Sequence, residues 1–141
     1  MTGRDEVAVL QEVLAAEHAV VYGYGVAGAR LTGGPRRRAQ QAWNGHRARR
    51  DELAGLVTGL GGEPEPTAAT YNLPGPVQSA EDARALATLL EERLAAVWAD
   101  AVAALDGGLR DLAVRGLGEA AVAAARWRGG SVAFPGLPER S

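Results

Sequence analysis

Four side chains that can bind a metal ion or a proton stand near the middle of four predicted helices. They are Glu17, His46, Glu91 and Glu119, with Glu92 as the alternative to Glu91. The first three interrupt otherwise apolar helix faces, and Glu119 borders one. A carboxylate on such a face is costly unless something pairs with it. Carboxylates and a histidine that meet inside a helical bundle can bind two iron or manganese ions. A di-metal site made of these residues, in an oxidoreductase or iron-handling protein, is therefore one hypothesis.

The spacing of the candidate ligands argues against that hypothesis. Di-metal bundles use Glu-x-x-His pairs, which chelate from one face of a helix. No such pair occurs in this chain, because Arg49 stands three residues after His46 and Val122 stands three residues after Glu119. A guanidinium has only donors, so it cannot ligate a metal. We therefore expect no bound metal, no cofactor and no catalytic residue, with iron or manganese as the alternative.

The favoured interpretation of the same residues is a buried network of ion pairs. Arg suits buried pairing because its planar fork matches a carboxylate. The expected pairs join carboxylates and arginines of different helices: Glu17 and Glu91 with Arg49 or Arg50, and Glu119 with Arg126. A tyrosine hydroxyl can add hydrogen bonds. The predicted polar cluster contains Glu17, Tyr24, His46, Arg49, Arg50, Glu91, Glu119 and Arg126.

Four helices must position this cluster. Apolar residues recur at the spacing of three and four that is typical of helices packed in a bundle. Thr2 with Asp5, and Ser79 with Asp82, resemble capping boxes and mark two helix starts. Gly and Pro residues separate the helices. The predicted helices span about 3–31, 35–60, 79–105 and 109–128.

The connections between these helices are short, long and short. The connection over 61–78 contains four prolines and cannot be regular helix. Fully extended, it reaches roughly 60 Å, enough to run beside helices of roughly 30 to 45 Å. One long crossover between the second and third helices is the ferritin-like topology, and a simple up-down bundle is the alternative. We predict one all-α domain over 1–141, a ferritin-like four-helix bundle with an extended tail over 129–141 docked in a groove.

Composition excludes several other functions. The chain has no Cys and only two His, which rules out disulfides, thiol catalysis and multi-histidine zinc sites. The net charge of -2 gives no electrostatic case for nucleic acid. No apolar run is long enough to span a membrane, and we expect a cytoplasmic protein. Trp98 lies at the edge of an apolar helix face, which favours a homodimer contact.

A glycine motif and a ligand pocket complete the sequence-based hypotheses. Residues 23–28 match G-x-G-x-x-G, but a dinucleotide site needs a strand before the motif, and here a helix pattern precedes it. We expect these glycines to allow close helix packing instead. A small-ligand pocket between the first two helices, lined by Tyr22, Tyr24 and Arg50, is a further alternative.

The chain also resembles a known family, the bacterial ferritin-like domains of unknown function, which are small stand-alone four-helix proteins. The similar segments follow one another over nearly the whole sequence: AEHAVVYGYGVAG, HRARRDELAGLVTGLGGEP, YNLPGPV, LATLLEERLAAVWAD, AAVAAARWR and FPGLP. The resemblance implies a ferritin-like bundle and supplies no activity. Ferritin-like proteins at large bind di-iron, but that role cannot be transferred to His46 and Glu119, which lack the chelating partners.

Overall fold

Four helices form the protein, which is therefore an all-α four-helix fold as the apolar periodicity predicts. The computed structural model describes residues 2–129. The helices are α1 (Gly3–Gly28), α2 (Gly33–Gly59), α3 (Ala80–Ala104) and α4 (Gly107–Gly129). Of the tail expected over 129–141 to dock in a groove, Gly129 ends α4, and residues 130–141 lie outside the described residues.

Side-chain caps begin two of the helices where the sequence places them. The Thr2 hydroxyl accepts a hydrogen bond from the Asp5 backbone N–H, and the Asp5 carboxylate accepts one from Thr2 N–H, which completes a capping box. The Ser79 hydroxyl accepts from Asp82 N–H at 3.0 Å. Caps of this kind satisfy backbone donors that have no partner inside the helix.

The end of α1 lies three residues before the predicted one. The backbone N–H of Arg30 and that of Leu31 donate to carbonyls three residues earlier, which tightens the chain into a turn. Gly33 then adopts a positive φ of 59°, a conformation that suits glycine. The helix therefore ends in a tight turn, and the apolar spacing alone does not reveal where that turn begins.

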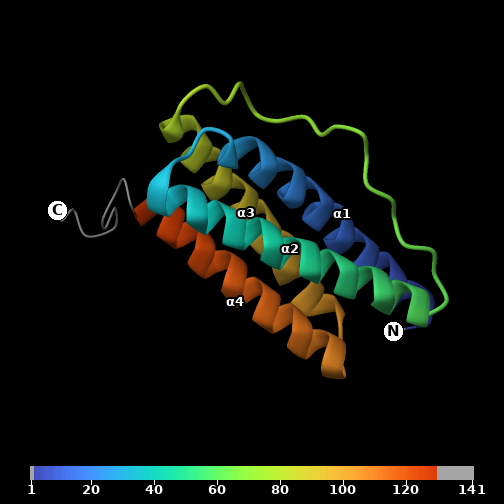
Figure 1. Ribbon diagram of the computed structural model, residues 1–141. Coiled ribbons are helices and arrows are strands. Elements are labelled where there is room, and N and C mark those ends of the chain that lie inside the picture. Colours follow the sequence, from blue (N-terminus) through green and yellow to red (C-terminus); the bar gives the residue numbers. More distant parts are fainter. Residues whose placement is uncertain (1, 130–141) are drawn as a thin grey trace.

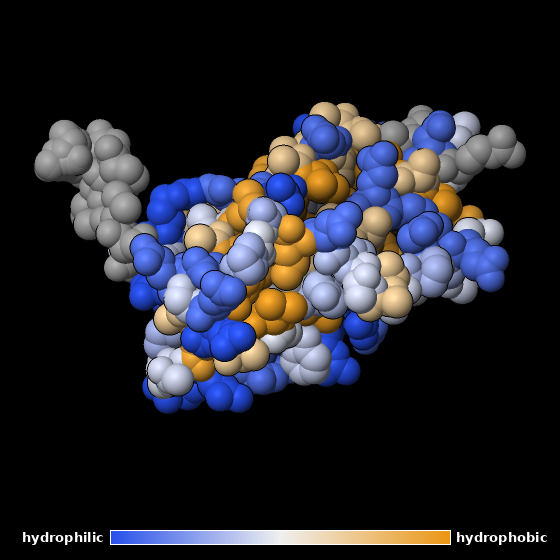
Figure 2. Space-filling view, turned by 90° about the horizontal axis from the view of Figure 1, so that it is seen from above, coloured by the Kyte–Doolittle hydropathy of each residue, from blue (hydrophilic) through white to orange (hydrophobic). Residues whose placement is uncertain are grey.

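The long connection lies along the helices. Figure 1 shows residues 60–79 leaving the end of α2, passing over the bundle beside α1 and reaching the start of α3 at the other end. The Gln11 side chain holds it by two hydrogen bonds, donating to Glu63 O and accepting from Glu65 N–H. His18 adds a hydrogen bond between its Nε2 atom and Glu65 O at 2.9 Å. On the face that carries this segment, apolar side chains gather along the middle and charged ones surround them (Figure 2).

Three helix pairs carry the packing. Helix α1 packs against α2 and α3, and α4 packs against α3, whereas no Cα atom of α2 lies within 8 Å of one in α4. Trp98 of α3 is only 1% exposed, and its indole lies where a Cβ atom at Gly116 of α4 would be, 2.3 Å from the ring. The expectation that Trp98 forms a homodimer contact is therefore wrong, because Gly116 leaves space for the ring inside the bundle.

Glycine also allows close packing at one position of the G-x-G-x-x-G motif. A Cβ atom at Gly23 would lie 2.3 Å from the Leu90 side chain of α3, whereas Gly25 and Gly28 have no neighbour within 4 Å. The motif lies wholly within α1, so it lacks the strand and loop that a dinucleotide site requires. Among the described helices, none combines the length and the apolar character needed to cross a membrane.

Candidate functional site: a histidine between two carboxylates

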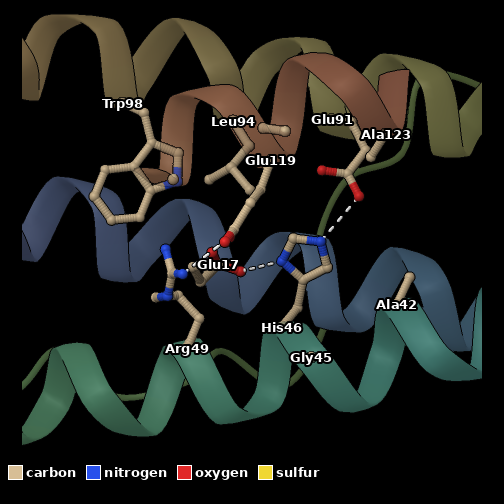
Figure 3. A pocket seen from close by; sticks show the side chains of 12 residues that line it. Glu17, Ala42, Gly45, His46, Arg49, Glu91, Leu94, Trp98, Glu119 and Ala123 are labelled. Carbon is tan, nitrogen blue, oxygen red and sulfur yellow. Dashed lines mark hydrogen bonds and ion pairs between the residues drawn. The ribbon is translucent and has the colours of Figure 1, made fainter. Parts of the chain in front are cut away.

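His46 lies between two buried carboxylates from different helices. Its Nδ1 atom is 2.7 Å from Glu17 Oε1 of α1, and its Nε2 atom is 2.9 Å from Glu91 Oε2 of α3. Each carboxylate is 1% exposed, and His46 is 16% exposed. Figure 3 shows the imidazole reaching up from α2 into the space between the other helices. The predicted convergence of mid-helix polar residues therefore exists for these three side chains.

The two carboxylates determine the charge of the imidazole. Burial lowers the pKa of His46, but the hydrogen bonds and negative charges of Glu17 and Glu91 outweigh burial and raise it to about 10. At neutral pH both ring nitrogens therefore carry a proton, and each donates to one carboxylate. The group is a buried imidazolium with two carboxylates, which places one net negative charge in the core.

Two aromatic side chains extend this network towards α4. The Tyr24 hydroxyl donates to Glu91 Oε2 at 2.6 Å, and the Trp127 indole N–H donates to the Tyr24 oxygen at 2.8 Å. The Tyr24 ring also stacks on His46 with 5.6 Å between ring centroids. Burial and the Glu91 charge raise the pKa of Tyr24, so its hydroxyl keeps its proton and remains a donor. All four helices thus contribute to one hydrogen-bonded chain.

The arginines do not pair as the sequence suggested. Arg49 donates to Glu119 Oε1 at 2.9 Å and to Glu52 at 3.1 Å, and it makes no contact of this kind with Glu17 or Glu91. Arg50 pairs with its neighbour Asp51. The imidazole of His46, about one turn before Arg49 on α2, is the shorter side chain and lies between Glu17 and Glu91. The longer guanidinium of Arg49 reaches across to Glu119 of α4.

Arg126, the expected partner of Glu119, lies on the exposed side of α4. Its backbone carbonyl accepts a hydrogen bond from Arg38, whose guanidinium lies 4.0 Å from the centre of the Trp127 ring. Arg38 thus places a cation beside the last turn of α4, where the helix dipole favours positive charge. This contact gives a role to one of three consecutive arginines at the start of α2.

A pocket of about 230 Å³ adjoins the network between α2 and α4. Glu17, His46 and Glu91 form one side of it, and Trp98 forms another (Figure 3). The space exists because the side chains on both of its sides are small. They are Ala42 and Gly45 of α2 on one side and Gly116, Ala120 and Ala123 of α4 on the other.

The ligand pocket expected between the first two helices is not lined by the three residues predicted for it. Tyr24 is 1% exposed and points into the network, whereas the Tyr22 ring lies 5.5 Å from Tyr71 of the long connection. Arg50 lies with Asp51. Tyr22 lines a surface pocket with Trp43 of α2 and Thr67 of the long connection, and neither Tyr24 nor Arg50 is part of that lining. The pocket beside the network lies between α2 and α4.

The residues present do not fit a di-metal centre. Both nitrogens of His46 already take part in hydrogen bonds to carboxylates, so neither has a lone pair available while the ring is protonated. Glu119 lies beside the guanidinium of Arg49. Over the described part of the chain, no group of three or more His, Cys, Asp or Glu side chains is arranged to hold a metal ion.

Sequence reasoning missed the roles of Trp127 and of the pocket. Trp127 is absent from the predicted polar cluster, although a buried indole N–H needs an acceptor, and that requirement was the available signal. The pocket had no comparable signal, because alanines and glycines on α2 and α4 are equally compatible with close helix contact.

Comparisons with known proteins agree on the fold and give no activity. The family described as "Domain of unknown function (DUF4439)" matches residues 9–139. A solved structure titled "Crystal structure of a conserved hypothetical protein, rv2844, from Mycobacterium tuberculosis" is similar, with 36% identity and a TM-score of 0.86 over 91% of this chain and 98% of that one. A comparison with curated proteins found no match. The chain therefore belongs to the DUF4439 family.

Proposed function

We propose that the protein is a non-catalytic, ferritin-like binding protein in which protonated His46 takes the place of a metal ion between carboxylates. The long connection over the bundle supports the ferritin-like topology. The observation that carries the proposal is that one imidazole bridges Glu17 and Glu91 through both of its nitrogens. The imidazolium supplies the positive charge and the donors that two buried carboxylates require.

Metal binding tests this proposal directly. Protein purified without chelator would be loaded with iron(II) or manganese(II) at neutral pH, desalted, and analysed for metal content. The expected result is much less than one metal ion per chain, because a cation must first displace the proton and imidazole of His46. Stoichiometric metal that is lost in Glu17→Ala would contradict the proposal and favour the oxidoreductase or iron-handling alternative.

Ligand binding is the second candidate function, and the pocket between α2 and α4 is the observation that favours it. The pocket joins a buried charged network to small apolar side chains such as Ala120 and Ala123. A few polar groups within apolar walls are typical of small-molecule sites. A ligand bound there would raise the melting temperature, and filling the pocket by Ala123→Leu should abolish that rise.

We also propose a homodimer, although buried Trp98 cannot form its contact. The outer side of α4 carries two exposed valines, Val114 at 52% and Val122 at 58% exposure, which are eight residues apart and so share a face. Sedimentation equilibrium over a range of concentrations tests it. A single species with the mass of one chain would remove the homodimer from the proposal.

A further inference from the structure

We infer that the pocket between α2 and α4 binds a small organic cation, a primary ammonium ion, through the free oxygen of Glu91. This inference rests on the ligand-binding function proposed above and names the chemical class of the ligand. Four features of the pocket support it: its position, its charge, an oxygen that lacks a partner, and the size of its apolar part.

The position makes the pocket a defined site that adjoins the network. The backbones of α2 and α4 stay apart, and the Arg49–Glu119 ion pair joins the two helices beside the opening. The pocket holds about 230 Å³, with Trp98 and Leu94 among its walls. Most drug-sized ligands occupy pockets of roughly 300–1,000 Å³. The space therefore suits a smaller molecule.

The charges around the pocket favour a cation. Three carboxylates line it, those of Glu17, Glu91 and Glu119, against two positive groups, Arg49 and protonated His46. One negative charge is thus in excess, and the two carboxylates that form the inner side are buried. An anion would meet these carboxylates, whereas a cation would reduce their mutual repulsion.

One oxygen identifies the group that the ligand must present. Glu91 Oε2 accepts from both His46 and Tyr24, but Glu91 Oε1 is buried and has no hydrogen-bond partner within residues 2–129. In Figure 3 it is the Glu91 oxygen that no dashed line reaches, and it lies on the side of the carboxylate where Leu94 and Trp98 are drawn. Leaving a buried charged acceptor unsatisfied is unfavourable. A ligand N–H⁺ group would donate to it, and an ammonium ion supplies both the donor and the charge.

The apolar walls of the pocket determine the rest of the ligand. Leu94, Ala120 and Ala123 offer no polar side-chain group, so a short alkyl chain fits beside them. The ammonium group would lie at the inner end near Glu91, with the alkyl chain directed towards the opening. A quaternary ammonium ion has no N–H donor and would leave the Glu91 oxygen unsatisfied.

Three matched probes test the inference on the full chain: n-butylammonium, n-butyltrimethylammonium and n-butanol. Each would be titrated at neutral pH while the indole N–H signal of Trp98 is followed by two-dimensional NMR. Trp43, which lies against Arg47 outside the pocket, serves as the internal control. We expect saturable shifts of Trp98 with n-butylammonium and at least tenfold weaker binding of the other two probes. Equal binding of all three would overturn the inference.

Variants locate the bound cation. Glu91→Gln should weaken n-butylammonium binding at least tenfold, because the amide removes the charge. The matched control is Glu92→Gln on the exposed neighbour, which should bind as the parent does. Ala123→Leu should block binding by filling the space, and it leaves every hydrogen-bonding group of the network in place. Undiminished binding by Ala123→Leu would place the cation elsewhere and overturn the inference.

A manganese(II) titration separates failure of the inference from failure of the proposed function. Absence of binding by both n-butylammonium and manganese(II) would overturn the inference and leave the non-metal function intact. Stoichiometric manganese(II) binding that Glu91→Gln removes would overturn both, since the free oxygen would then be a metal ligand.

Discussion

Raising the pH above neutrality should destabilise this protein through the loss of one proton from His46. In the folded protein Glu17 and Glu91 raise the pKa of His46 to about 10, whereas the ordinary value of 6.5 applies in the unfolded chain. Since the folded state binds the proton more tightly, the stabilisation is fully present below pH 6.5 and is lost as the pH rises through about 10. A neutral imidazole has a single N–H donor and cannot satisfy both carboxylates.

The size of the effect follows from linkage. A pKa raised from 6.5 to about 10 corresponds to a stabilisation on the order of 5 kcal/mol at low pH. Between about pH 7 and pH 9 the free energy of unfolding should fall by roughly 2–3 kcal/mol, since each pH unit between the two pKa values changes it by somewhat more than about 1 kcal/mol at most. This loss is a large part of the stability of a small domain.

Urea denaturation followed by far-UV circular dichroism at several pH values measures this slope. His46→Gln is the matched variant, because glutamine keeps a donor near the carboxylates but cannot titrate. The variant should be less stable at pH 7 and should show little pH dependence up to pH 9. A parent protein whose free energy of unfolding is constant between pH 7 and pH 9 would refute the buried imidazolium, whatever the variant does.

Two further substitutions test the packing around the network. Tyr24→Phe leaves the Trp127 indole N–H without its acceptor. It should lower the free energy of unfolding, measured by urea denaturation, by about 1–3 kcal/mol. A loss below about 0.5 kcal/mol would contradict the hydrogen-bonded chain. Gly116→Ala puts a methyl group into the Trp98 ring and should lower the free energy of unfolding by about 1–3 kcal/mol. The control Gly118→Ala meets nothing within 4 Å and should raise it by up to about 1 kcal/mol. Equal shifts of the melting temperature in the two variants would refute the proposed packing.

Local rules predicted the helices well, because each signal lies within a few residues. The capping box at Thr2 forms as expected. Ser79 caps α3, but its box is incomplete because the Asp82 carboxylate accepts from the Gln78 N–H. Apolar spacing also placed Glu17, His46 and Glu91 at mid-helix positions on inward faces. What spacing cannot supply is how far each side chain reaches across the bundle, and that distance decides the partners.

The errors in pairing show this limit. His46 and Arg49 are nearly one turn apart on α2 and face the same interior, so the sequence alone does not tell which of them meets Glu17. The short ring fits at the centre, and the long guanidinium spans the gap to Glu119. Trp98 gives the second case, since its burial depends on the absence of a side chain at Gly116 on another helix. Contacts between helices thus depend on side-chain volumes at positions that are distant in sequence.

The protonation state of His46 is the most direct test of the account. A pH titration of the imidazole ¹⁵N signals by long-range ¹H–¹⁵N NMR, assigned with His46→Gln, reports both ring nitrogens separately. We expect both nitrogens of His46 to keep imidazolium shifts from neutral pH to about pH 9. A titration of His46 near its ordinary pKa of 6.5, or a single neutral tautomer at pH 7, would contradict it.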